Sequence, residues 1–237
     1  PLYIMFFIIP IKMFGLNLIL LKFLSLIFFT LSIYFFFLAF FKRINNLILF
    51  TSILLTCVNW FLLSYASLTY TECFFMFLSS LFFYGFFNLK EKLDIENWTL
   101  KTTYSGWIFL GLGLLILSLT RNIAIVCILA VLVYFVLNKQ FKALFFTIIS
   151  FSFFKIIYEI VKSTIWGNKA ILSDQFEIIL RKEAYNPSAG YEDLSGFFTR
   201  FISNSVIYLS GRFWEIIGFK EDNGDFNPIL TILLFII

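Results

Sequence analysis

The chain has 237 residues, of which 61% are hydrophobic and only 14% are charged. Because soluble domains are about half apolar, this composition excludes a water-soluble globular protein and predicts a membrane protein. The net charge of +4 comes from Lys and Arg spread through loops, without the basic stripe that nucleic-acid binding requires. We therefore expect membrane lipid, and no nucleic acid, as a partner.

Residues 3–13 are apolar but short and contain Pro10, which favours an interfacial or re-entrant helix. Further along, apolar runs predict about six membrane spans, and Gly106, Gly111 and Gly113 in the fourth allow close helix approach. The predicted spans are 17–41, 47–63, 71–88, 103–119, 123–137 and 143–161.

Basic residues in the short loops predict the orientation of the chain. Alternate loops carry most of these residues, and the intervening loops carry only Arg121. By the positive-inside rule the first set of loops is cytoplasmic. The turn at 64–72, the hairpin at 120–122 and the segment 162–225 then face outward. The cytoplasmic set comprises Lys42, Arg43, Lys90, Lys92, Lys101, Lys139 and Lys142.

The outward segment is the sizeable polar part of the sequence. Asp174 followed by Glu177 predicts a helix start, and this helix runs to about Ala184. A turn at 185–190 comes next. From Leu194 to Leu209 apolar residues recur at helical spacing, which predicts a helix lying along the outer leaflet surface. This helix covers the spans or gates a substrate, and the sequence leaves both alternatives open.

The predicted fold is an all-α, polytopic membrane helix bundle with a small helical extracytoplasmic segment. We expect the bundle at 1–161, the extracytoplasmic segment at 162–225, and the start of a truncated further span at 226–237. The chain opens on Pro1 and closes inside an apolar run, so we interpret it as a fragment of a longer protein.

Three isolated charges, Lys22, Glu72 and Arg121, fall in the predicted outer third of the membrane. An ionisable group inside a span costs at least ~2.5 kcal/mol and therefore usually faces a cavity or a partner. Two cations and one anion suit an anionic ligand such as a lipid phosphate. Alternatively, Lys22 snorkels to the interface and Arg121 simply ends a hairpin.

The absence of histidine and the positions of the cysteines limit the catalytic and metal-binding chemistry that the chain can perform. Histidine is absent, which removes the commonest zinc ligand and the usual base at neutral pH. The three cysteines lie in or beside apolar runs, so they predict neither a disulfide framework nor a metal site. Lys155 and Glu159 are one helical turn apart and are expected to pair with each other.

Several short motifs resemble the polytopic GT-C glycosyltransferases, the protein-mannosyltransferase-like enzymes that include lipid A aminoarabinose transferases. The start of the chain is similar to the beginning of that family's second transmembrane block. Thr71-Glu72 is similar to the Ser/Thr-plus-acid of the next outward turn, and the hairpin around Arg121 resembles the family's repeating helical hairpin. The motifs are Pro1-Leu2-Tyr3, Lys12-Met13-Phe14-Gly15-Leu16-Asn17, Leu21-Lys22, Ser118-Leu119-Thr120-Arg121 and Asn138-Lys139-Gln140-Phe141-Lys142.

The resemblance implies a transferase of the bacterial inner membrane that moves a sugar from a polyprenyl-phosphate carrier to an acceptor outside the cytoplasm. The polyprenyl-phosphate sugar is then the donor substrate and no cofactor is expected, while dependence on a divalent metal is left open. The family's catalytic acid would lie upstream of Pro1, so no catalytic base is assigned. Glu72 becomes a site-facing acid, and Lys22 and Arg121 are candidates for binding the lipid phosphate.

Two other classes of protein would also place charges within spans or carry a polar outward segment. A transporter, flippase or polysaccharide polymerase should show paired helix breaks near mid-membrane and an internal repeat. A non-catalytic scaffold would use the outward segment as a docking surface. An acid in a short outward loop just before Pro1 would favour the transferase over both.

Overall fold

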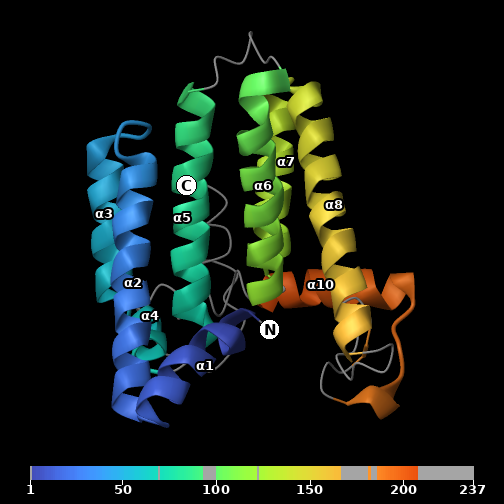
Figure 1. Cartoon of the computed structure of the whole chain (residues 1–237). Coiled ribbons are helices and arrows are strands. Elements are labelled where there is room, and N and C mark those ends of the chain that lie inside the picture. Colours follow the sequence, from blue (N-terminus) through green and yellow to red (C-terminus); the bar gives the residue numbers. More distant parts are fainter. Residues whose placement is uncertain are drawn as a thin grey trace. The chain divides into compact units, whose positions relative to one another are not determined.

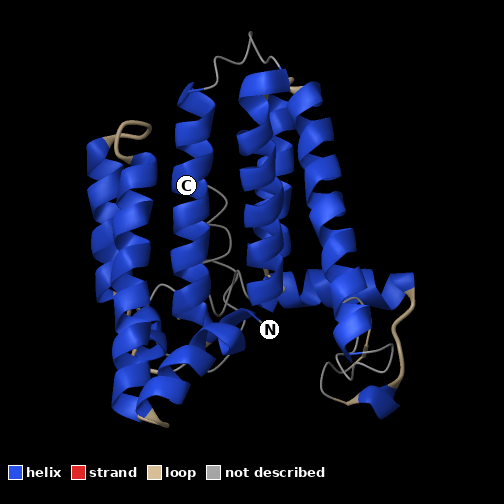
Figure 2. Cartoon of the chain, in the orientation of Figure 1, coloured by secondary structure: helices blue, strands red, loops and turns tan. Residues whose placement is uncertain are grey.

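The computed structural model describes residues 2–68, 70–92, 100–121, 123–166, 181–182 and 186–207. Over these residues the fold is all-α, as predicted, and contains no strand (Figure 2). The chain divides into two compact units. One comprises Pro1–Leu54 with Ser64–Gly167, and the other comprises Leu55–Leu63 with Asn168–Ile237.

The first unit is a helix bundle in which long helices run alongside one another and reverse direction at each connection (Figure 1). Helices α3 and α4 each have residues in both units, because residues 55–63 belong to the second unit. The helices are α1 (Leu2–Phe14), α2 (Leu18–Phe40), α3 (Asn46–Val58), α4 (Trp60–Ala66), α5 (Thr71–Lys92), α6 (Leu100–Thr120), α7 (Ala124–Leu137) and α8 (Phe141–Trp166).

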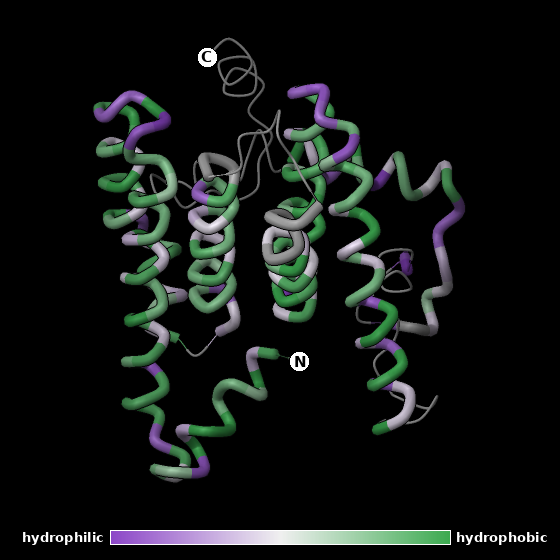
Figure 3. The backbone as a smooth tube through the Cα atoms, turned by 45° about the horizontal axis from the view of Figure 1, so that its top comes forward, coloured by the Kyte–Doolittle hydropathy of each residue, from purple (hydrophilic) through white to green (hydrophobic). Residues whose placement is uncertain are grey.

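Three helices are long and apolar enough to cross a membrane, namely α2, the Thr71–Leu89 part of α5 and the Phe141–Ile165 part of α8. The long helices are mostly hydrophobic along their length, and hydrophilic residues gather at the turns (Figure 3). The protein is therefore a membrane protein. Helix α7 and the described Gly106–Thr120 part of α6 are shorter apolar helices, so the six spans remain a prediction.

The predicted run 47–63 forms two helices rather than one, because the chain breaks at Asn59. The Asn59 side-chain oxygen accepts a hydrogen bond from the backbone N–H of Leu62 at 3.1 Å, which caps α4 and ends α3. Helices α3 and α4 are bent by 59° at this point, and together they pass the length and hydropathy criteria for one broken span or a re-entrant loop.

Helix α2 packs along α5, and α6 packs along α8. Two of the predicted close approaches occur: a Cβ on Gly111 would lie 2.8 Å from the Ser150 carbonyl carbon, and one on Gly113 would lie 2.6 Å from the Phe82 ring. The Ser150 hydroxyl also donates a 2.7 Å hydrogen bond to the Trp107 carbonyl. The core at this junction consists of Phe82, Phe86, Leu110, Leu114, Leu117, Ala124, Val131, Phe135 and Ala143.

In the second unit, the predicted turn contains a short 3₁₀ helix, η2 (Pro187–Ala189), and the predicted amphipathic helix is α10 (Leu194–Ile207). The helix expected to start near Asp174 lies outside the described residues over most of its length. Of its expected last turn the structure describes Arg181 and Lys182, which are not helical: Arg181 forms an isolated antiparallel bridge with Tyr191, and Lys182 lies in a bend. The chain doubles back there instead.

Candidate functional site

Glu72 is the second residue of α5, directly after the turn that follows α4. A carboxylate in the first turn of a helix is stabilised by the unpaired N–H groups there. The turn itself is held by the Ser67 hydroxyl, which donates to the Ser64 carbonyl at 2.7 Å. Ser25 of α2 donates to the Leu68 carbonyl at 2.9 Å. The first bond closes the turn, and the second ties it to α2 just before α5 begins.

Arg121 follows the last residue of α6, and its backbone N–H still donates to the Leu117 carbonyl at 3.2 Å. A cation at the C-terminal end of a helix is favoured by the unpaired carbonyls there. Arg121 Nη1 lies 2.6 Å from Glu72 Oε1, and the two side chains keep 36% and 25% of their surface exposed. The structure thus joins the start of α5 to the end of α6 through an ion pair.

The ion pair uses only part of each side chain. Glu72 Oε2 is buried and has no hydrogen-bond partner among the described residues. The Arg121 guanidinium makes no second ion pair or hydrogen bond with the part of the chain that the structure describes. A guanidinium has five N–H donors and a carboxylate has two acceptor oxygens. Glu72 therefore keeps one acceptor oxygen unused within the described residues, and the Arg121 guanidinium keeps donors that could bind an anion.

Tyr3 of α1 is a neighbour of this pair that the sequence analysis did not single out as a site residue. Burial, with smaller contributions from the Cys73 and Glu72 groups, raises the pKa of its phenol to about 12. The Tyr3 ring lies 4.4 Å from the Phe7 ring and 5.9 Å from the Phe74 ring, measured between centroids. Its place in the Pro-Leu-Tyr motif was the signal that could have identified it.

The structure does not bring Lys22 into the ion pair. Its side chain is exposed on α2 and forms no ion pair with any carboxylate of the described segments. The phosphate-binding role of Lys22 therefore stays a prediction without a contact to support it. The predicted pair on α8 is confirmed, since Lys155 Nζ lies 2.8 Å from Glu159 Oε1, and Lys162 lies 3.5 Å from the other oxygen.

Over the described stretches of the chain, no group of three Cys, Asp or Glu side chains is placed to hold a metal ion. Neither a family model, nor a curated protein, nor a solved structure matches this sequence. The Glu72–Arg121 pair and its neighbours are therefore the observations on which a function can be built.

Proposed function

We propose that this protein is a multi-pass glycosyltransferase of the bacterial inner membrane. The enzyme would transfer a sugar from a polyprenyl-phosphate carrier to an acceptor at the extracytoplasmic face. The observation that supports this proposal is the Glu72–Arg121 pair at the adjoining ends of α5 and α6, with Glu72 Oε2 buried and without a hydrogen-bond partner in the described part of the chain. The resemblance to the GT-C enzymes supplies the reaction class.

Transfer would proceed by direct displacement at the anomeric carbon of the sugar. The acceptor oxygen forms a bond to that carbon while the bond to the carrier's phosphate oxygen breaks. The acceptor proton passes to a carboxylate expected upstream of Pro1. The unused N–H groups of Arg121 would donate to the departing phosphate, whose charge grows as the bond breaks. Glu72 Oε2 would accept a hydrogen bond from a sugar or acceptor hydroxyl.

Arg121 can hold Glu72 and a phosphate together because its guanidinium is planar and its donors point along more than one edge. A lysine at this position has a single charged nitrogen and would have to choose between the two anions. The ion pair in the structure is consistent with an arginine oriented by Glu72 and ready to bind a phosphate.

The test uses the full-length enzyme in membranes, with a labelled polyprenyl-phosphate sugar as the donor. We expect Glu72→Gln and Arg121→Ala each to lower the transfer rate at least tenfold, which corresponds to about 1.4 kcal/mol of transition-state stabilisation. Arg121→Lys should retain an intermediate rate. Glu159→Gln is the matched control, because it makes the same change in the ion pair on α8 and should transfer at the wild-type rate.

Membrane insertion and thermal unfolding must be measured for each variant, since loss of Arg121 leaves Glu72 without its partner. An uncompensated, partly buried carboxylate costs about 1–3 kcal/mol, so Arg121→Ala is expected to unfold at a lower temperature than Glu72→Gln. Wild-type transfer by both inserted variants would refute the site assignment.

One observation favours a transporter or flippase as the second candidate. The break at Asn59 bends α3 against α4 by 59°, and broken apolar helices form the binding sites of many secondary transporters. Protein-dependent movement of a polyprenyl-phosphate sugar between leaflets, without transfer to any acceptor, would support this second function over the first.

A further inference from the structure

Helix α10 of the second unit has two faces that differ sharply in character. Its apolar residues gather along one side, and no residue of the helix is buried. Large side chains on this apolar face keep most of their surface exposed, with 76% for Leu194, 59% for Phe198, 60% for Phe201 and 60% for Ile202. Residues at this spacing share one side of a helix. An exposed cluster of this kind marks a contact surface rather than an ordinary solvated face.

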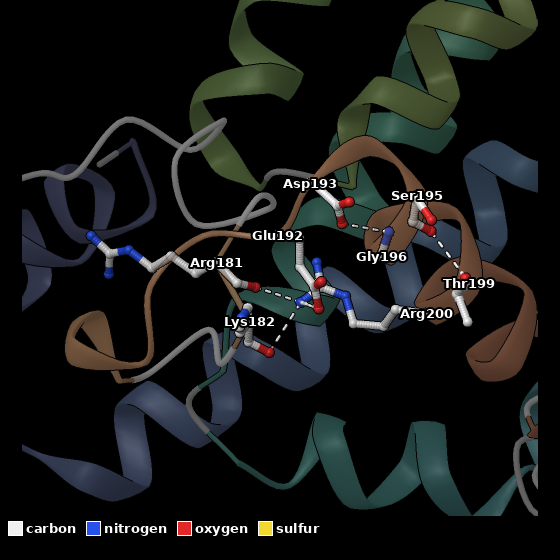
Figure 4. A network of polar contacts seen from close by, with 8 residues as sticks. All are labelled: Arg181, Lys182, Glu192, Asp193, Ser195, Gly196, Thr199 and Arg200. Carbon is white, nitrogen blue, oxygen red and sulfur yellow. Dashed lines mark hydrogen bonds and ion pairs between the residues drawn. The ribbon is translucent and has the colours of Figure 1, made fainter.

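The opposite face of α10 is held by the preceding chain (Figure 4). Arg200 Nη1 donates to the carbonyls of Arg181 and Lys182, the latter at 3.1 Å, and lies 3.8 Å from Glu192 Oε1. The Lys182 N–H donates to the Gly190 carbonyl at 3.1 Å, next to the bridge between Arg181 and Tyr191. The polar side of the helix therefore already has partners, and the apolar side is the one left to be covered.

The start of α10 is fixed by its own side chains. Asp193 Oδ1 accepts a hydrogen bond from the Gly196 N–H at 2.8 Å, and Thr199 donates to the Ser195 carbonyl at 2.9 Å. A cap fixes the first turn of a helix, so the side chains that follow keep their positions around the helix axis. The apolar stripe is thus a defined surface.

We propose that α10 is an interfacial helix whose apolar face inserts into the lipid surface of the membrane. The chain itself supplies this surface, because residues 167–193 connect α10 to α8, a helix long and apolar enough to cross a membrane. Covalent attachment at this range gives a high effective concentration of lipid at the helix. An amphipathic helix with phenylalanine and leucine on one face and polar groups on the other is the type that lies in the interface plane.

The driving force for this contact is apolar burial rather than charge. Residues 181–200 carry Arg181, Lys182 and Arg200, which Glu183, Glu192 and Asp193 balance. We therefore expect α10 to insert equally into neutral and anionic bilayers. This inference does not depend on the transferase proposal, since a transporter or a scaffold would carry the same helix.

The experiment uses the full chain in nanodiscs of phosphatidylcholine, with Cys57, Cys73 and Cys127 replaced by serine. Single spin labels are placed at Leu194→Cys and Phe201→Cys on the apolar face, and at Thr199→Cys and Ser203→Cys on the opposite face as matched controls. All four side chains are exposed, so labelling should leave the fold intact. Collision rates are measured with oxygen, which partitions into lipid, and with a water-soluble nickel chelate.

Labels at positions 194 and 201 should collide mainly with oxygen, at a depth of about 5–10 Å below the headgroups. Labels at 199 and 203 should collide mainly with the nickel chelate. Equal nickel accessibility on both faces would overturn the proposal, because α10 would then lie in water. Protection of position 201 from both reagents would also overturn it, because protein, from this chain or a second copy, would then cover the face.

Discussion

At the scale of single residues, the environment of Tyr3 determines the protonation state of its phenol next to the candidate site. Its phenol is partly buried among aromatic rings of α1 and α5 and lies within electrostatic range of Glu72 and Cys73. Each of these influences disfavours the phenolate. Tyr3 therefore remains a neutral hydroxyl at any physiological pH.

The raised pKa of Tyr3 predicts how alkali destabilises the protein. Between about pH 10, where an unfolded tyrosine ionises, and about pH 12, the folded chain still holds this proton and the unfolded chain does not. The free energy of unfolding must then fall as pH rises through this window. Tyr3→Phe should show a smaller fall, measured by thermal unfolding in detergent across these pH values.

Absorbance of the phenolate gives an independent check on the same group. The difference between the alkaline titrations of wild type and Tyr3→Phe isolates one tyrosine of the eleven, and its midpoint should lie near pH 12. Tyr70→Phe is the control, because this side chain is 52% exposed. A midpoint near 10 for Tyr3 would mean that it does not lie in the buried environment described above.

Two of the three predicted site residues meet because of where they stand in the chain order. Glu72 starts one helix and Arg121 ends another, and successive helices return to the same end of a bundle. The position of Lys22 depended instead on how α2 is rotated about its axis. Leu21 and Ser25 are buried while Lys22 is exposed. An almost uniformly apolar helix carries no periodicity from which that rotation could be predicted.

At the scale of elements, the α6–α8 contact brings the backbones of two helices close together. Gly111 lets the backbone of α6 approach Ser150 of α8, whose hydroxyl bonds to the Trp107 carbonyl. Between apolar helices in a membrane, close packing and hydrogen bonds of this kind replace the hydrophobic effect as the force that holds helices together. The composition of the sequence predicts the helices, and the glycines predict where they meet.

Gly111→Ala is expected to lower the free energy of unfolding by about 1–2 kcal/mol. Overpacking costs about 1–3 kcal/mol, and the higher helix propensity of alanine returns up to about 1 kcal/mol. The new methyl would meet backbone of α8, which can yield only by moving the helix. Thermal unfolding of the full chain in one detergent measures the change.

Gly85→Ala is the matched control for this substitution, because its methyl would meet only the tip of the Phe109 ring, a side chain that is 37% exposed and free to turn aside. We expect this variant to unfold at or slightly above the wild-type temperature. If Gly111→Ala were equally stable, α6 and α8 would not be in the close contact that the structure gives.

Asn59 shows where hydropathy fails at the element scale. The run 47–63 reads as one span because a single asparagine barely changes the average over such a window. Its side chain nevertheless competes for the backbone and caps a new helix, which splits α3 from α4. Local hydrogen bonding, and not apolar content, decided the shape of this segment.

At the scale of the whole bundle, the sidedness of the predicted loops agrees with the direction of the helices in the first unit. The starts of α2 and α5 and the ends of α6 and α8 lie at one end of this unit, and the turns around Lys42 and Lys139 lie at the other (Figure 1). The two turns with Lys42, Arg43, Lys139 and Lys142 and the Glu72–Arg121 pair thus occupy opposite ends. A membrane with its cytoplasmic side at the basic end satisfies the positive-inside rule.

Cysteine accessibility in intact cells tests this arrangement. Ser67→Cys lies in the exposed turn before Glu72, and Asn46→Cys lies at the exposed start of α3, at the other end of the unit. A membrane-impermeant maleimide should label Ser67→Cys in whole cells and Asn46→Cys only after permeabilisation, because a bilayer around the apolar helices separates the two ends. The parent protein without native cysteines is the blank, and labelling of both variants in denaturant confirms that both are present.

Labelling of Asn46→Cys alone would reverse the orientation and move the Glu72–Arg121 pair to the cytoplasmic side, which would remove the basis for an extracytoplasmic acceptor. Equal labelling of both in whole cells would mean that these helices do not separate the two ends across a membrane.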